Sequence, residues 1–242
     1  MEARSSKWRT VKVAIHQPEH LPWLGFFHKM WMCDVFVLLD NVPYSRNDFQ
    51  NRNKIRTGGT STGWCWLTVP VLTKGRFGQK LNEVEINAAD KTWSRGCWKS
   101  INYSYGRARH FEKYEGFVNE LYNKTSWDSL LALNIHIIKF LKQAFEIDRQ
   151  IKLASEICET GSGSELLLRI CQKLGADEYI SGRVGKDYLD EALFDQQGIE
   201  VTYQSFRHPE YPQAYKPFIP NLSAIDLLFN CGDEARGIFS PT

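Results

Sequence analysis

Three polar segments of this sequence each follow a short apolar run and carry side chains that can bind or activate a substrate. The first, His16-Gln17-Pro18, comes directly after the short run 12–15, which is apolar apart from Lys12. A histidine held at the end of a buried strand has the fixed position that a general base requires. The competing interpretation is a structural histidine bonded to a neighbouring carbonyl group. The sequence thus makes His16 a candidate base and Gln17 a candidate binding residue.

The second and third segments are rich in small residues. Residues 160–164 contain Ser162 and precede a helical pattern, so their backbone N–H groups suit an anion such as phosphate. Residues 181–187 combine two glycines with two cations. Candidate binding groups in and beside this segment are Ser181, Gly182, Lys186 and Tyr188, and Asp187 is a candidate for orienting a substrate hydroxyl. A capped helix start and a solvated loop are the respective alternatives.

Two further segments carry charged and polar groups. Asp40 ends the apolar run 34–40, and Asn51, Arg52 and Lys54 follow in a polar stretch suited to phosphate or sugar hydroxyls. Residues 91–113 interleave six cations with aromatic residues, a pattern typical of single-stranded nucleic-acid binding and equally of an amphipathic helix. Because the net charge is only +2, nucleic acid is not expected as a main partner.

The elements that position these groups form βαβ units. Strands are predicted at residues 12–15 and 34–40 around a helix at 21–32, and at 151–157 and 178–180 around a helix at 162–174. Capping boxes are expected at Ser162 with Glu165 and at Ser223 with Asp226, the latter opening a final helix at 223–229. Further strands are expected at 64–71, 81–86 and 199–205, with residues 41–63 irregular and Ser126 capping a helix. The prediction is an α/β fold: a mainly parallel sheet with covering helices and a helical insertion at about 92–146, within a single domain 11–242 preceded by a flexible segment 1–10.

Composition sets the remaining limits. Of the 242 residues, 43% are hydrophobic and 13% aromatic, which favours a folded globular chain. No apolar run reaches the ~18–20 residues of a membrane span, and the polar start of the chain lacks an apolar secretion segment, so a cytoplasmic protein without membrane insertion is expected. The six cysteines show no CxxC spacing, which argues against a disulfide framework or a zinc site, and no metal site is predicted.

Five segments in order resemble the WbqC-like protein family: VAIHQPEHLPWLGFFHKM at 13–30, DVFVLLDNVPYSRNDFQNRNKI at 34–55, WLTVPV at 66–71, ADEYISGRVGKDYLDEALFDQQGIEV at 176–201 and PFIPNLSAIDLLFN at 217–230. The resemblance implies a bacterial protein of surface-polysaccharide (O-antigen) biosynthesis, with an aminoacyl (glycine) transferase activity suggested for the family. The resemblance implies that the residues matching the family motifs belong to the functional site. These residues are His16, Gln17, Asp40, Asn51, Arg52, Lys54, Ser181, Gly182, Asp187 and Tyr188. Glu19-His20 and Arg183-Val184 depart from the family pattern.

The leading hypothesis is a group transferase that acts on an activated or nucleotide-linked sugar. His16 would deprotonate the acceptor, Asp40 or Asp187 would orient it, and Arg52, Lys54 and Lys186 would hold phosphates. An ATP-dependent ligase that activates a carboxylate is the first alternative, and a non-catalytic protein binding RNA or an assembly partner is the second. ATP and a nucleotide-sugar are both compatible as the donor, and the sequence leaves the cofactor and the oligomeric state open.

Overall fold

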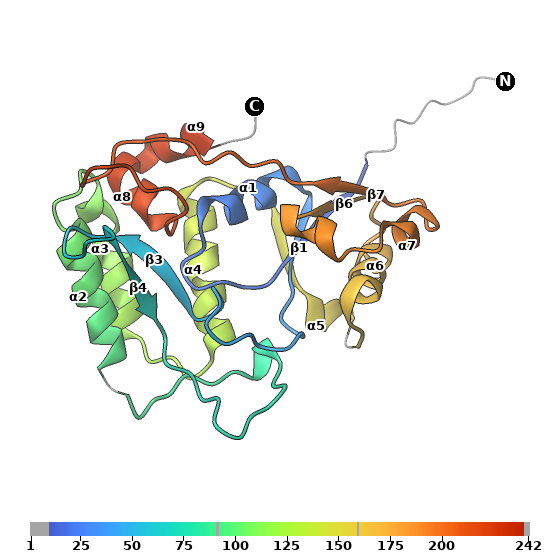
Figure 1. Cartoon of the computed structure of the whole chain (residues 1–242), viewed down its shortest axis with the longest axis horizontal. Coiled ribbons are helices and arrows are strands. Elements are labelled where there is room, and N and C mark those ends of the chain that lie inside the picture. Colours follow the sequence, from blue (N-terminus) through green and yellow to red (C-terminus); the bar gives the residue numbers. More distant parts are fainter. Residues whose placement is uncertain (1–9, 91, 159, 240–242) are drawn as a thin grey trace.

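The computed structural model describes residues 10–90, 92–158 and 160–239. Within these residues the centre of the fold is a five-stranded sheet with the order β5-β2-β1-β6-β7 (Figure 1). All four strand pairs are parallel, which confirms the predicted α/β class. The strands are β1 Lys12–His16, β2 Val35–Leu38, β5 Gln150–Leu153, β6 Glu178–Ser181 and β7 Glu200–Tyr203. Of the predicted flexible segment 1–10, residues 1–9 lie outside the described part.

Helices connect the parallel strands as the two predicted βαβ units require. Helix α1 (Leu24–Met32) joins β1 to β2, whose register places Val13 beside Val35. The short helix α5 (Ala154–Ile157) and α6 (Gly163–Lys173) join β5 to β6. The 3-10 helix η3 (Arg183–Asp187) and α7 (Glu191–Asp195) lead on to β7. A parallel pair needs such a crossover, because the chain must return to the edge at which the first strand began.

The two faces of the sheet bury different sets of side chains, since successive strand residues point to opposite sides. Ala14, Phe36 and Ile180 belong to the larger core, which includes α1 and most helices outside the βαβ units. Val13, Val37 and Tyr179 point to the smaller core under α5, α6 and α7. The central strands β1, β2 and β6 are therefore covered on both sides, whereas the edge strands β5 and β7 stay partly exposed.

The long segment between β2 and β5 forms a second body of structure beside the sheet, on the left of Figure 1. It contains an antiparallel hairpin and a set of helices, so the helices predicted within 92–146 are present. Its elements are β3 Arg52–Arg56, β4 Trp64–Thr68, the 3-10 helix η1 Leu81–Glu83, α2 Trp93–Tyr105, α3 Phe111–Asn119, the π-helix η2 Glu120–Lys124 and α4 Leu130–Ala144. After β7 follow α8 Ile225–Cys231, the 3-10 helix η4 Gly232–Glu234 and α9 Ala235–Phe239.

Two strand predictions are wrong in this region and at β5. The partner of β4 is β3, which lies in the segment predicted to be irregular, whereas residues 81–86 form η1 and one isolated bridge between Val71 and Ile86. The run at 151–157 is divided, because Asp40 accepts hydrogen bonds from the backbone and hydroxyl groups of Ser155 and so fixes the start of a helical turn there. Both outcomes depend on contacts distant in sequence.

The predicted helix starts at residues 126 and 223 and the predicted capping box at Ser162 also need correction. Helix α4 is capped by Ser129, whose Oγ accepts from the backbone of Ala132. Ser162 is the N-cap residue of α6, but its side chain makes no capping bond. Helix α8 begins two residues late at Ile225 and is not the last helix. Asp226 cannot complete a capping box there, because its carboxylate accepts from Tyr211 and Gln213 in the interior.

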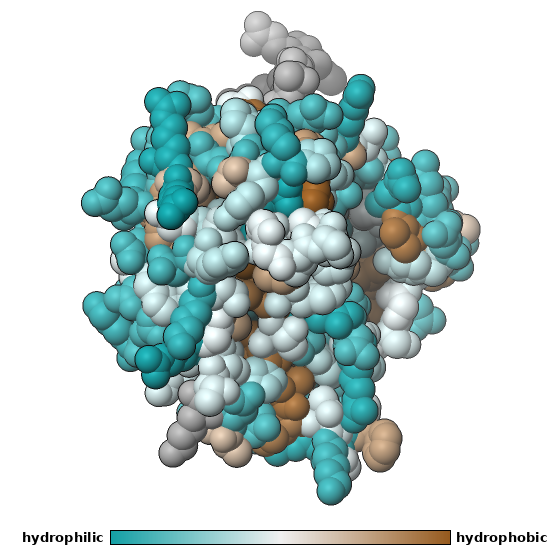
Figure 2. All heavy atoms as spheres, turned by 60° about the vertical axis from the view of Figure 1, so that its left-hand side comes forward, coloured by the Kyte–Doolittle hydropathy of each residue, from teal (hydrophilic) through white to brown (hydrophobic). Residues whose placement is uncertain are grey.

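The cysteines, the helices and one face of the surface can each be compared with what the composition predicts. All six cysteines fall within the described residues and are free. No helix in the described ranges is long and apolar enough to cross a membrane. Figure 2 shows the end of the molecule that carries α2 and α3, where hydrophilic residues predominate and hydrophobic ones appear in small areas. This face gives no sign of a large exposed apolar patch.

Candidate functional site

A cavity of about 850 Å³ lies at the carboxyl ends of the parallel strands. It is lined by residues at the end of β1 (His16, Gln17), by the loop before α6 (161–163), and by residues at the end of β6 and just after it (181–185). The three loops therefore meet, as the sequence predicts. The strand order reverses direction between β1 and β6, and such switch points are where open α/β sheets bind ligands. Topology and cavity thus agree on one place in the molecule.

His16 is the last residue of β1 and keeps 27% of its side-chain surface exposed in this cavity. Its Nδ1 lies 2.9 Å from the carbonyl oxygen of Gln17, an arrangement in which Nδ1 donates and Nε2 keeps a free lone pair. The ring packs edge-to-face on Phe26, with centroids 5.0 Å apart. Burial, with the nearby charge of Lys29, lowers the pKa of His16 to about 3, so the imidazole is neutral at physiological pH.

Glu19 and Lys29 are buried ionisable residues that also line the cavity. Glu19 Oε1 lies 3.9 Å from His16 Nε2, and its Oε2 is buried with no hydrogen-bond partner. Burial, reinforced by the charge of Asp48, raises the pKa of Glu19 to about 8. Lys29 Nζ donates a 2.7 Å hydrogen bond to the carbonyl oxygen of Ile15, and burial lowers the pKa of Lys29 to about 8. Two groups that can exchange protons near neutral pH thus flank the imidazole.

The remaining cavity wall combines amides with aromatic rings. Gln17 Oε1 accepts a 2.5 Å hydrogen bond from Gln50, and the amide of Gln204 donates to the backbone of Gly25 at 2.7 Å. Trp23 and Phe206 pack edge-to-face at 5.6 Å. The other lining side chains of these kinds are Phe49, Tyr179, Tyr188 and Asn221, and Arg183 adds a cation. Amides that bind hydroxyl groups beside aromatic faces are suited to a sugar or a nucleoside.

Six of the predicted site residues are brought together in this cavity. They are His16, Gln17, Ser162, Ser181, Gly182 and Tyr188. Gly185, in the same loop, lets the chain approach closely, because a Cβ at this position would lie 2.1 Å from Ser181 Oγ. The sequence was sufficient to predict that the loops after β1 and β6 meet, because both directly follow strands of one parallel sheet.

Asp40 and Asn51 are not among the residues that line the cavity, and both make structural hydrogen bonds. Asp40 is buried and accepts from the backbone N–H of Ser155 at 2.9 Å and from its hydroxyl at 2.6 Å, which ties the end of β2 to α5. The side-chain amide of Asn51 donates a 2.9 Å hydrogen bond to the carbonyl oxygen of Val69. This bond extends the pairing of the hairpin beyond β3 and β4. These contacts give both residues a role in holding the chain.

Arg52 and Lys54 project from β3 rather than into the cavity. The Arg52 guanidinium lies 4.2 Å from the ring centroid of Trp66, and Lys54 Nζ lies 4.3 Å from that of Trp64. Arg52 also donates a hydrogen bond to the carbonyl oxygen of Asn47. The cations therefore stack on aromatic rings of the neighbouring strand β4, contacts typically worth about 0.5–1 kcal/mol at exposed sites.

Asp187 and Lys186 are exposed in η3 and are absent from the cavity lining. Lys186 Nζ lies 5.0 Å from the ring centroid of Tyr203. Arg183, two residues after the end of β6, is the cation of this loop that reaches the cavity. The 3-10 turn of η3 explains why Arg183 reaches the cavity and Lys186 and Asp187 do not, because successive side chains of such a turn point in different directions.

The basic and aromatic segment 91–113 is split between surface and interior. Lys91 lies outside the described residues. Tyr105 and Phe111 are in the core and pack edge-to-face against Phe229, at 5.2 Å each. Lys113 is exposed and pairs with Asp233 at 2.5 Å. These aromatic rings therefore support the fold of α2 and α3 rather than form an open stacking surface.

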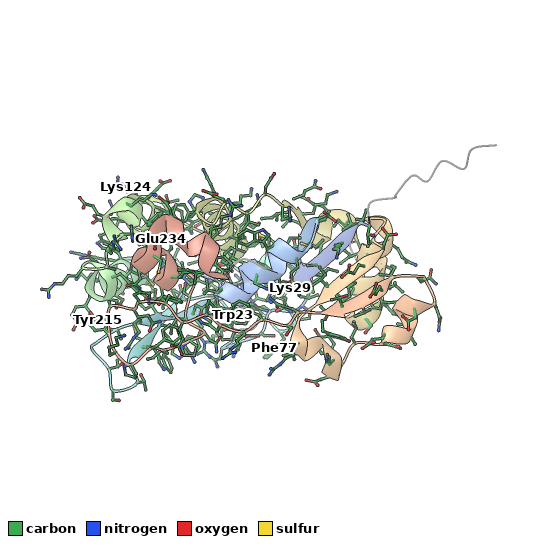
Figure 3. All side chains as sticks on the ribbon, turned by 90° about the horizontal axis from the view of Figure 1, so that it is seen from above. Trp23, Lys29, Phe77, Lys124, Tyr215 and Glu234 are labelled. Carbon is green, nitrogen blue, oxygen red and sulfur yellow. The ribbon has the colours of Figure 1, made fainter. Side chains whose placement is uncertain are left out.

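Glu19, Lys29 and Gln204 are cavity residues that the sequence analysis missed. A signal existed for Lys29, because it lies beside Phe26 and Met30 on the buried face of α1, where a cation is costly. Figure 3 labels Lys29 and Trp23 in the middle of the molecule, at α1.

Among the residues that the structure describes, no group of three or more His, Cys, Asp or Glu side chains is placed to hold a metal ion.

Comparison with known proteins places this chain in a family. The model of the WbqC-like protein family matches residues 17–238. The chain belongs to the WbqC-like protein family. A curated protein of Mycobacterium tuberculosis (strain ATCC 25618 / H37Rv), the uncharacterised protein Rv1507c, is 34% identical over 227 residues, covering 93% of this chain and 95% of its own length. No solved structure matches. The WbqC-like match begins at Gln17, beside His16, and includes both strand-end loops of the cavity.

Proposed function

We propose that this WbqC-like protein is a group transferase that attaches an acyl group, such as an aminoacyl group, to an activated or nucleotide-linked sugar of surface-polysaccharide biosynthesis. The observation that carries the proposal is His16, a neutral imidazole with a free Nε2, held at the strand end in a cavity of about 850 Å³. Acyl transfer needs a proton acceptor at the attacking amine or hydroxyl, and this geometry supplies one.

In the proposed reaction His16 Nε2 takes the proton of the acceptor group as the new bond forms. The imidazolium that results is stabilised by the carboxyl group of Glu19, whose oxygen Oε1 lies 3.9 Å from Nε2 and carries partial negative charge. Glu19 thereby takes the orienting role first expected of Asp40 or Asp187. His16 can afterwards return the proton to the leaving group, so one residue serves both steps.

The sugar would be bound by amides and aromatic rings, and its phosphates by Arg183 and the loop before α6. Gln17 and Gln204 present amides, and Trp23 with Phe206 presents flat apolar faces. Residues 161–163 are exposed and lead into α6, an 11-residue helix whose first N–H groups attract anions. Lys186, exposed in the same turn as Arg183, would contact phosphates that extend out of the cavity.

A thermal-shift screen against nucleotide-sugars, ATP, amino acids and short RNA tests this proposal, because a ligand that binds only the folded state raises the Tm. We expect a shift with a nucleotide-sugar that is lost in Arg183→Ala and retained in Arg52→Ala, whose side chain stacks outside the cavity. A shift lost only in Arg52→Ala would move the binding site to the hairpin. A shift with RNA alone would contradict the proposal.

The second candidate is an ATP-dependent ligase that activates a carboxylate. The strand order favours it, because a parallel sheet with β1 at its centre and a reversal beside it is typical of nucleotide-binding α/β proteins. Carboxylate-dependent exchange of pyrophosphate into ATP would establish this activity. Its absence, combined with a nucleotide-sugar thermal shift, would favour the transferase.

A further inference from the structure

Lys29 is an amine on the inner wall of the cavity with almost no contact with bulk solvent. It is 3% exposed, extends from α1 and lines the cavity together with His16 and Gly182. Its Nζ is held by the 2.7 Å bond to Ile15, and a Cβ built on Gly182 would lie 4.0 Å from it. The amine is therefore fixed between the ends of β1 and β6, at the switch point of the sheet.

Lys29 has no carboxylate within ion-pair distance among the described residues. Burial therefore favours its neutral form, and the pKa of about 8 leaves a substantial neutral fraction at physiological pH. An exposed lysine with a pKa near 10.4 has roughly a hundredfold smaller neutral fraction at pH 7. Desolvation of this kind activates lysine as a nucleophile toward carbonyl groups. The nearby Glu19 is protonated at the same pH and can act as an acid.

We propose that Lys29 forms an imine with the aldehyde or ketone group of a phosphorylated or nucleotide-linked sugar bound in this cavity. The inference rests on the proposed function in one respect, namely that an activated sugar enters the same cavity. It adds that the sugar carries a free carbonyl group and is held covalently. Arg183 and the loop at 161–163 would face its phosphates.

The step balances without a further reactant. The neutral amine of Lys29 attacks the carbonyl carbon, and the carbonyl oxygen takes a proton from Glu19. The ammonium nitrogen of the adduct returns one proton to Glu19, and Glu19 passes it to the hydroxyl group. This group leaves as water while the nitrogen lone pair forms the C=N bond, and the last N–H proton restores Glu19. Amine and carbonyl compound thus give imine and water. His16 Nε2, 3.9 Å from Glu19, can accept the proton that the amine releases.

Reductive trapping with pyridoxal 5′-phosphate and cyanoborohydride tests the inference, because this probe carries an aldehyde and a phosphate. Modified lysines of the wild-type protein are mapped by peptide mass spectrometry at limiting probe. We expect Lys29 to be labelled about 10²-fold faster than exposed lysines at pH 7, following its neutral fraction. Labelling confined to exposed lysines, with Lys29 unmodified, would overturn the proposal.

Matched controls separate covalent capture from other effects. Lys29→Arg keeps a cation and should lose the label, whereas Lys139→Arg, altered at an exposed site of α4 outside the cavity, should retain labelling of Lys29. Pyridoxine 5′-phosphate has no aldehyde, so equal protection by both compounds without any trapped adduct would show anion binding alone and overturn the imine. Nucleotide-sugar binding without trapping at Lys29 would support the transferase and overturn the imine. Trapping at Lys29 without nucleotide-sugar binding would support the imine and overturn the transferase.

Discussion

Glu19 Oε1 lies 3.9 Å from His16 Nε2, and neither side chain forms a shorter ion pair with any residue that the structure describes. Both side chains are buried enough to disfavour their charged forms, so burial raises the pKa of Glu19 and lowers that of His16. The pair is therefore neutral when the cavity is empty, and a proton can pass between them when a ligand changes the local charge. Several measurable consequences follow from this geometry and from the contacts around it.

His16 should stay neutral well below the usual histidine pKa. We expect nitrogen NMR to show a neutral ring with the proton on Nδ1 at pH 5, because burial and Lys29 oppose protonation and the Gln17 carbonyl accepts from Nδ1. Titration of this ring between pH 6 and 7 would contradict the structure.

Replacing His16 should remove turnover without unfolding the protein. Once a substrate is identified, His16→Ala should lower kcat by at least about 10²-fold, the usual contribution of a general base. His208→Gln is the matched control, since His208 is half-buried outside the cavity. An unchanged kcat in His16→Ala would remove His16 from the mechanism.

Lys29→Met should stabilise the protein while impairing the site. The folded pKa of about 8 is below the unfolded value, so burial of the charge costs stability at neutral pH, and that cost disappears as pH rises from about 8 to 10.5. We expect urea unfolding to give a gain of about 1–3 kcal/mol at pH 7 that shrinks above pH 8. Lys186→Met, at an exposed position, should change stability little. A loss of stability in Lys29→Met that is constant with pH would show a purely structural role.

Glu19→Gln should alter the pH dependence of stability in the opposite sense. Because the folded pKa of about 8 is above the unfolded value of 4.5, the wild-type carboxyl contributes stability below pH 4.5 that is lost as pH rises to about 8. The free energy of unfolding of the variant, relative to wild type, should therefore rise between pH 5 and 8 and level off above. Parallel curves for the two proteins would refute a raised pKa.

Asp40→Asn and Asp187→Asn should have different effects. Asp40 accepts two hydrogen bonds from Ser155, and an amide cannot accept with both atoms, so we expect a loss of about 1–3 kcal/mol with ligand binding retained in the folded protein. Asp187 is exposed, and its replacement should stay within about 0.5 kcal/mol. Loss of turnover in Asp40→Asn at unchanged stability would support a catalytic role for Asp40.

The sequence alone determined the local pattern of this protein. The apolar runs at β1, β2 and β6, each followed by a polar loop, were sufficient to predict a parallel sheet and the meeting of the loops that carry His16 and Ser181. The reason is that strand and helix periodicity is set by neighbouring residues, and the handed βαβ crossover leaves few arrangements of such units.

Only the tertiary structure decided which charged residues enter the cavity. Asp40, Arg52 and Lys54 have the residue types of a site, yet the first binds Ser155 and the other two stack on β4. Lys29, placed on an apolar helix face, belongs to the cavity. Hydrogen bonding, cation–π contact and desolvation all depend on neighbours distant in sequence, so burial and pKa are properties of the folded chain and not of the residue type.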